Sequence, residues 1–414
     1  MNKQEFLTAL RMRLSGLAET EIERPLNYYS EMIDDRMEEG LTEDQAVEAI
    51  GTVEQVSSQI LEDMPKAQTV SANANVSKEE KIFTVGEAFS GISAECLECG
   101  IELCPADNGI CRIVFRETGS ARISVTVTDD TLFIKREGER KWFENFTDLR
   151  DKAAIRLYLP KKEYAGLYIK TSSGDVKVPG GFGFTAVNIG TKSGDVMFCA
   201  SVSGLTAIKA VSGDIGLYST SSANISAQST KGDVSAENVL AENEMKIEAT
   251  SGDIRLLCVR SGELTVGSVS GDISIDKASS FGLIARSTNG DMAIRNVISE
   301  TDISVSAVNG DVRLSGIKAR DVVSSSVNGD IAFTSVTATG SIRISNQNGD
   351  IHLTESDAGD LTLKTTSGDI SGTLLTEKIF SATALSGSVS VPHTSSGGRC
   401  EAKTLSGDIT LRIK

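Results

Sequence analysis

The chain has 414 residues, of which 39% are hydrophobic and 5% aromatic, and its formal net charge is −16. This acidity excludes nucleic acid or an anionic membrane as the main partner, because phosphate binding needs clustered Lys and Arg. No segment has the apolar length of a membrane span, and none has the pattern of a secretion signal. We therefore expect a cytoplasmic protein, with the cell surface reached by an unrecognised route as the alternative.

Residues 1 to 64 carry apolar side chains at helical spacing, separated by capping boxes such as Thr42 to Gln45. This pattern predicts four short helices packed on one small core. The second helix presents a cluster of acidic residues beside a tyrosine: Tyr28, Glu31, Asp34, Asp35, Glu38 and Glu39. We interpret this acidic cluster either as a solvated helix face or as a docking surface for a basic partner.

The run from Tyr28 to Gly40, followed by Ala46 and Ile50-Gly51, resembles the HAAS signalling domain of Gram-positive bacteria. The resemblance covers about the first 62 residues. It implies signalling rather than catalysis, and a protein partner that is either a PadR-type helix-turn-helix regulator or a membrane protein. HAAS domains are often fused to membrane helices, but no membrane helix follows here.

Residues 65 to 80 are small and polar and are interpreted as a linker. Residues 81 to 170 alternate in polarity over short runs, which predicts irregular strands that cap the N-terminal end of a repeat. Four cysteines fall in this segment: Cys96, Cys99, Cys104 and Cys111. We interpret them as strand or turn positions, with a metal or redox site as the alternative, and a cytoplasmic location would keep the thiols reduced.

From Gly174 onward, a Ser/Asn-Gly-Asp corner recurs every 19 or 20 residues, thirteen times when Gly387-Ser388 is included. Apolar residues recur at a spacing of two on both sides of each corner, which predicts two strands per unit. One such unit cannot bury its apolar face alone, whereas stacked units share a continuous core. The sequence therefore predicts a mainly β protein, a parallel β-solenoid of about thirteen rungs over residues 171 to 414. An antiparallel meander is the competing architecture.

The corner residues form a structural ladder that includes Gly174-Asp175, Gly194-Asp195, Gly213-Asp214, Gly252-Asp253 and Gly310-Asp311. The phase of the apolar pattern predicts that the aspartates point outward. We expect each carboxylate to accept hydrogen bonds from local backbone amides. A row of bound Ca²⁺ is the alternative, although the glycine-rich nonapeptide of calcium-binding β-rolls is absent.

The segment from Ile155 to Pro160, the segment from Leu167 to Val176 and the repeats that follow resemble the toast-rack, or putative adhesin, β-strand-repeat proteins. That resemblance implies either adhesion or envelope-stress signalling. No catalytic, cofactor-binding or metal-binding residue set emerges, and the even rung spacing leaves no insertion to build a cleft. We therefore expect a non-enzymatic scaffold or signalling protein without a cofactor. The alternatives are a surface adhesin or ligand-binding solenoid and a Ca²⁺-dependent binding protein. An open C-terminal rung at residues 409 to 414 would permit a homodimer.

Overall fold

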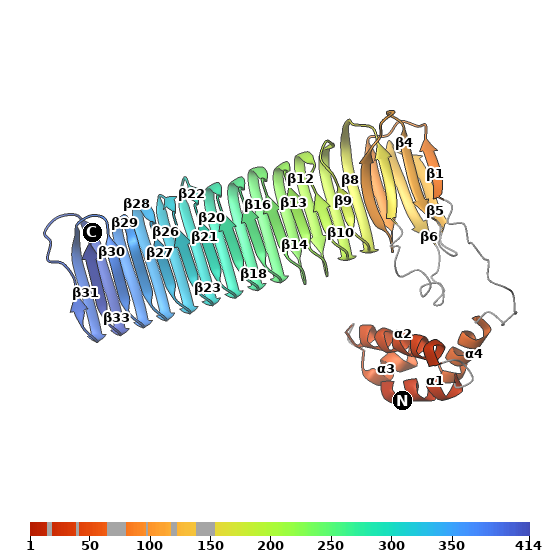
Figure 1. The fold of residues 1–414 in the computed structure, drawn as a ribbon, viewed down its shortest axis with the longest axis horizontal. Helices are drawn as coiled ribbons and strands as arrows, with labels where there is room; N and C mark the ends of the chain where they lie inside the picture. Colours follow the sequence, from red (N-terminus) through yellow and green to blue (C-terminus); the bar gives the residue numbers. More distant parts are fainter. Residues whose placement is uncertain (15–18, 39–40, 64–79, 97, 117–121, 138–153) are drawn as a thin grey trace. The chain divides into compact units, whose positions relative to one another are not determined.

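The computed structural model describes residues 1–14, 19–38, 41–63, 80–96, 98–116, 122–137 and 154–414 (Figure 1). These residues form two compact units, one of helices and one of strands. The predicted linker and the charged stretch around Trp142 lie almost entirely outside the described residues. Within the described part of the chain, no helix combines the length and the apolar character that crossing a membrane requires.

The helical unit contains α1 (Lys3–Arg13), α2 (Glu19–Glu38), α3 (Glu43–Glu48) and α4 (Val53–Asp63). Asn2 and Thr42 cap α1 and α3 through capping boxes, and Thr52 accepts the Gln55 amide in the same way at the start of α4. Thr20 begins a Thr-x-x-Glu sequence that is typical of a capping box, but it lies inside α2. The apolar faces meet in a small core made of Phe6, Leu10, Leu14, Ile22, Tyr29, Ile33, Ala46, Val47, Val53, Val56 and Ile60.

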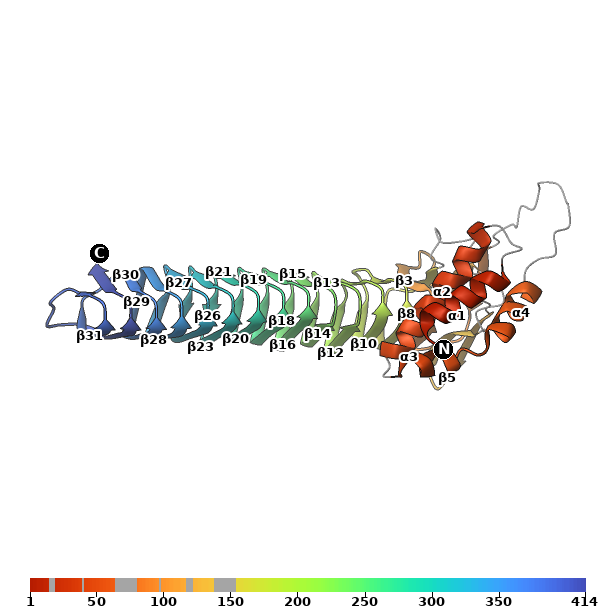
Figure 2. The same ribbon diagram turned by 90° about the horizontal axis from the view of Figure 1, so that it is seen from below.

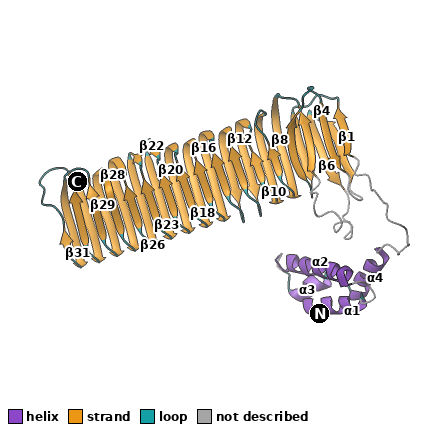
Figure 3. Cartoon of the chain, in the orientation of Figure 1, coloured by secondary structure: helices purple, strands orange, loops and turns teal. Residues whose placement is uncertain are grey.

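The other unit is a β-solenoid with two parallel sheets, which we call the long-strand sheet and the short-strand sheet (Figures 1 and 3). A rung is one long strand and the short strand that follows it across a corner. The parallel pairing confirms the predicted solenoid and excludes the meander. The long-strand sheet contains β8 (Glu163–Ser173), β10 (Gly183–Ser193), β12 (Ser201–Ala210), β14 (Ser221–Ser229), β16 (Leu240–Ser251), β18 (Arg260–Ser270), β20 (Ser279–Asn289), β22 (Ile298–Ser299), β23 (Asp302–Asn309), β25 (Lys318–Ala319), β26 (Asp321–Asn328), β28 (Thr337–Asn348), β29 (Ile351–Ser367), β31 (Lys378–Ser386) and β33 (Gly398–Ser406).

The short-strand sheet forms the opposite wall of the stack, and Figure 2 shows the two walls along the axis of the solenoid. The first residues of β29 also pair within this sheet. Its other strands are β9 (Val176–Val178), β11 (Val196–Phe198), β13 (Ile215–Tyr218), β15 (Val234–Glu237), β17 (Ile254–Leu257), β19 (Ile273–Asp276), β21 (Met292–Arg295), β24 (Val312–Ser315), β27 (Ile331–Thr334), β30 (Ile370–Leu374), β32 (Val389–Ser390) and β34 (Ile409–Ile413).

The interior between the sheets is filled by one residue in two along each strand. In β17, for example, Ile254 and Leu256 are buried while Arg255 between them is exposed. The residue three positions before each corner glycine is small because it lies close to the preceding corner. Ser229 and Thr365, which occupy this position, donate hydroxyl hydrogen bonds to the carbonyls of Gly213 and Gly349 at 3.0 and 3.1 Å. These bonds tie neighbouring corners together.

The N-terminal end of the solenoid is irregular, because several of its strands run antiparallel to their neighbours. β1 and β5 each begin one sheet as an antiparallel edge strand, and β2 and β3 form a first rung that pairs in parallel with β8 and β9. The strands of this end are β1 (Glu80–Val85), β2 (Gly91–Cys96), β3 (Gly100–Pro105), β4 (Cys111–Arg116), β5 (Arg122–Thr128), β6 (Thr131–Glu137) and β7 (Ala154–Leu159).

The last rungs are not stacked in chain order. β33 lies between β29 and β31, and β34 lies between β30 and β32. The rung formed by β31 and β32 therefore ends the stack, although β33 and β34 follow it in sequence. This corrects the prediction that residues 409 to 414 form the open end. The physical reason is that all corners are alike, so spacing alone does not determine which rung stacks last.

Candidate functional site

The corner aspartates form a continuous hydrogen-bonded ladder along the outside of the solenoid. The Asp195 amide donates to the Asp175 carboxylate at 3.2 Å, and the Asp214 amide donates to Asp195 at 3.0 Å. The same bond recurs at every later corner, up to the Asp408 amide on Asp369 and the Ser388 amide on Asp408. The expected local bonds are therefore replaced by bonds between rungs. Each bond offsets the repulsion between stacked carboxylates, because an amide hydrogen lies between neighbours.

Ser388 occupies the last position of this ladder, and its place explains its identity. Each carboxylate accepts the amide of the next rung, but the rung of Ser388 is the outermost one. A carboxylate at this position would have no further amide to accept. Ser therefore replaces Asp at the corner of the rung that ends the stack. The order of the repeats in the sequence does not show that this rung is the last one.

The corner glycines explain why the rungs stack so closely. A Cβ on Gly271 would lie 2.1 Å from the Gly252 carbonyl oxygen, and the φ of Gly271 is +150°. Both the close approach and the backbone conformation require glycine at this position. Among the described residues, no group of three or more His, Cys, Asp or Glu side chains could hold a metal ion. The column of corner glycines is therefore explained by the close approach of stacked backbones.

The carboxylate of Asp408 makes the terminal rung sensitive to acid. The backbone amide and the hydroxyl of Ser388 hold the pKa of Asp408 below its ordinary value of 3.8. Because the pKa of Asp408 is lower in the folded state, its ionised carboxylate stabilises docking of the rung at any pH above the unfolded-state pKa. This stabilisation is lost as the pH falls through the folded-state pKa. In an NMR titration we expect the Ser388 amide shift to follow an Asp408 midpoint below 3.8. Asp408→Asn should remove this transition, and a midpoint at or above 3.8 would contradict the assignment.

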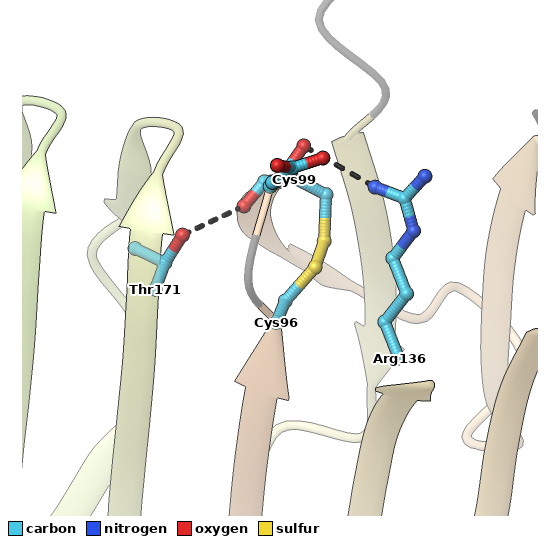
Figure 4. Close-up of a disulfide and its surroundings, with 5 residues drawn as sticks. Cys96, Cys99, Arg136 and Thr171 are labelled. Atoms are coloured by element: carbon cyan, nitrogen blue, oxygen red, sulfur yellow. Dashed lines mark hydrogen bonds between the residues drawn. A yellow bond between two sulfur atoms is a disulfide. The ribbon is translucent and has the colours of Figure 1, made fainter. Parts of the chain in front are cut away.

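The first corner replaces Ser-Gly-Asp with a disulfide between Cys96 and Cys99 (Figure 4). The strand registers place Cys96 opposite Thr171 and Ile101 opposite Val176, so Cys99 stands where later rungs carry the corner glycine. A side chain fits there because no described corner stacks in front of it. The Thr171 hydroxyl donates to the Cys99 carbonyl at 3.1 Å, as at later corners. The disulfide corrects the expectation that these two thiols are reduced.

Cys104 and Cys111 are strand residues with protonated thiols. Burial raises the pKa of Cys104 and raises that of Cys111 to about 11, so neither is an activated nucleophile. Of the two histidines, His352 contacts the hydroxyls of Ser371 and Thr354 at 2.9 and 3.1 Å on the outer face of the short-strand sheet. No described carboxylate is bonded to its ring. The residues that nucleophilic catalysis requires are therefore not assembled around His352.

The predicted docking face on α2 is only partly described. Asp34 is exposed and forms an ion pair with Lys3 at 2.6 Å. Tyr28 is half-buried and packs edge-on against Tyr29, with 5.1 Å between ring centroids. The side chains of Glu31, Asp35 and Glu38, and all of Glu39, lie outside the described residues. The Lys3 pair adds a basic side chain to a face that we had described as acidic alone.

A buried ion pair near the end of the solenoid was missed at the sequence level. The Lys378 ammonium lies 2.6 Å from Asp357, and their side chains are 4% and 10% exposed. The second carboxylate oxygen of Asp357 is buried without a hydrogen-bond partner. Lys378 begins β31, whereas Asp357 belongs to β29, so the pair joins the terminal rung to a rung beyond the inserted β33.

The chain is a β-solenoid protein. Its two parallel sheets are wound into a solenoid that has an irregular strand cap, and it carries a separate helical unit. The chain belongs to the Toastrack DUF4097 family, whose model matches residues 99–296 and 277–414. The HAAS model matches residues 5–59. These matches confirm both resemblances seen in the sequence.

Two solved structures are similar to the chain. One is described as a putative adhesin from Bacteroides fragilis, with 14% identity, a TM-score of 0.20, and coverage of 82% of this chain and 98% of the other. The second is described as a putative lipid binding protein from Parabacteroides distasonis, with 17% identity, a TM-score of 0.21, and coverage of 72% and 95%. No curated protein matches the chain.

Proposed function

We propose that this chain is a non-enzymatic signalling scaffold that acts by protein–protein interaction. The HAAS domain binds the partner, a PadR-type regulator or a membrane protein, and the solenoid presents a long, regular surface. The observation that carries the proposal is the HAAS match at residues 5–59 joined to a solenoid whose rungs carry no insertion that could form a cleft. A role in the bacterial envelope-stress response and a cytoplasmic location are parts of this proposal.

A surface adhesin is the second candidate, and the Cys96–Cys99 disulfide favours it. Disulfides persist in oxidising compartments and are rare in the cytosol. Cell fractionation separates the two candidates. Recovery of the native chain in the cytosolic fraction supports the scaffold. Recovery at the cell surface with the disulfide intact supports the adhesin.

The docking hypothesis can be tested by exchanging the charges of one ion pair. In the double variant Lys3→Asp/Asp34→Lys, the intramolecular pair is retained while the charges presented to a partner are reversed in place. We expect a cross-linking pull-down with the full chain to recover a regulator or membrane protein. The exchange at residues 3 and 34 should reduce that recovery by on the order of tenfold or more.

The matched control is the exchange Arg13→Glu/Glu54→Arg, which reverses a second exposed pair of the same unit. We expect this variant to recover the partner as the native chain does. If both exchanges reduce recovery equally, the effect is one of overall charge and not of docking at Asp34. If the native chain recovers neither class of partner, the signalling proposal fails.

A further inference from the structure

The two strands of the outermost rung, β31 and β32, carry no charged residue after Lys378, and the exposed Glu377 lies just before them. Residues 379 to 391 contain no Asp, Glu, Lys or Arg, although 24% of the chain is charged. The preceding residue, Lys378, is neutralised by Asp357 in the buried pair. An uncharged end on a chain of net charge −16 is a local exception to the composition of the whole molecule.

The interior of this rung is also open. Val389 is 44% exposed, whereas Ile409, which occupies the same inward position one rung further in, is fully buried. Phe380, Ala382 and Ala384 pack against the core but are only partly buried. The rung therefore presents apolar side chains that a further layer of strands would cover.

The backbone of this rung contains amides that, in the other rungs, donate hydrogen bonds to carbonyls of the neighbouring rung. The Gly407 amide donates to the Ser386 carbonyl, and the Ile409 amide donates to the Ser388 carbonyl, each at 2.9 Å. The equivalent amides of the last rung belong to Gly387 and Val389, and no described carbonyl accepts from them. A strand edge of this kind pairs readily with another chain, and soluble proteins usually protect such edges with charge, proline or a bulge.

The exchange of rung order is what makes the end uncharged. The inserted strand β33 carries Arg399, Glu401 and Lys403 on its exposed face. Stacking in chain order would have placed these charges at the end of the solenoid and the uncharged rung inside it. The observed order places the charged rung one position inside the end of the stack, and Ser388 removes the corner carboxylate only at the outermost position.

We propose that the end formed by β31 and β32 is a self-association surface whose occupant is a second copy of this chain. A two-fold axis places β31 antiparallel to β31 of the second copy, and the open apolar positions of both rungs then cover each other. The acidic charge of the chain lies mainly before residue 154, because residues 154–414 carry 24 Lys and Arg against 27 Asp and Glu. The uncharged end offers no charge for an acidic or basic partner to bind, so it fits an equally uncharged surface, and the same end of a second copy is such a surface. The dimer does not depend on which partner the HAAS domain binds.

The test uses the full chain with charge placed at the end of the solenoid. Leu385 is 80% exposed, and Ser388 already donates its backbone amide to Asp408 as a corner aspartate would, so we expect Leu385→Asp/Ser388→Asp to keep the fold. The control is Leu405→Asp, because Leu405 is 54% exposed at the same position of the next rung inward. Sedimentation equilibrium measures the dissociation constant. Circular dichroism checks the strand content of each variant.

We expect the native chain and Leu405→Asp to sediment at twice the 43.8 kDa chain mass. In the double variant, the dissociation constant should rise on the order of 100-fold, because each added carboxylate is brought against an uncharged rung that offers it no counter-ion. Small-angle scattering should give the native dimer a maximum dimension well above that of the monomeric variant, as end-to-end pairing requires. A monomeric native chain at about 100 μM, a dimer that resists the double substitution or an equal effect of Leu405→Asp would each overturn the proposal.

Discussion

The substitution Gly271→Ala is expected to lower the free energy of unfolding by about 3–5 kcal/mol, because it combines backbone strain with a collision inside the stack. The φ of Gly271 is +150°, a conformation that residues with a side chain rarely adopt. Its new Cβ would also lie 2.1 Å from the Gly252 carbonyl oxygen, which is backbone and cannot turn away. The rungs on either side of the substituted corner should therefore separate.

The matched control for this substitution is Gly267→Ala, four residues earlier in the same rung. Nothing lies within 4 Å of a Cβ at Gly267, so this variant should be neutral or slightly stabilising, by about 0.5 kcal/mol. Urea unfolding gives the midpoints, and hydrogen exchange locates the loss, since repeat proteins need not unfold in one step. Equal midpoints for the two variants would show that the corner tolerates a side chain.

The second large effect is expected at the buried ion pair. Lys378→Met should destabilise the terminal rung by about 3–5 kcal/mol, because Asp357 would keep a buried charge without a counter-ion. The loss should be local, since each rung contacts only its neighbours. We expect faster amide exchange in β31 and β32 and faster proteolysis of the connection between β32 and β33. The middle rungs should keep native exchange rates.

The double variant Lys378→Met/Asp357→Leu separates the charge effect from the loss of packing. Removing both charges should restore most of the stability lost in the single variant, because the desolvation penalty disappears with the ions. The double-mutant cycle then gives the coupling between the two side chains. A double variant as unstable as Lys378→Met alone would show that the ammonium acts through packing and not through charge.

Much of the solenoid could be predicted because its periodicity reports local geometry. A spacing of two around each corner requires strands, and a fixed corner spacing requires rungs in register. The second corner of each rung could not be predicted, because its left-handed residues share no type. They are Ser219, Asn238, Cys258, Lys277, Asn296, Gly316, Ser335 and Glu355. The left-handed conformation at these positions is stabilised by backbone hydrogen bonds between neighbouring rungs. It does not depend on a residue type that favours this conformation.

The stacking order of the last rungs could not be predicted from the repeat, although two residues depart from its pattern in the rung that ends the stack. Ser388 interrupts the aspartate column, and Lys378 falls at an inward position where other rungs carry an apolar or small residue. Either one indicates an exceptional rung, but only the three-dimensional stack shows that the exception is the end. The disulfide was similarly concealed, because Cys96 and Cys99 stand at corner positions whose equivalence to Ser-Gly-Asp depends on the register with β8 and β9. The docking face on α2 remains a prediction.

The inserted last rung has a consequence for how the protein is made. β31 and β32 are synthesised before β33 and β34, yet they dock on them. Growth of the stack by successive addition, which suits every earlier rung, cannot complete this end. The β31–β32 rung has to wait, or to let go of a provisional position on β29 and β30, until the residues up to Ile413 are available. The last rung of the solenoid can therefore dock only after β33 and β34 have been synthesised. Its uncharged end is formed last, and a chain halted before β34 lacks it.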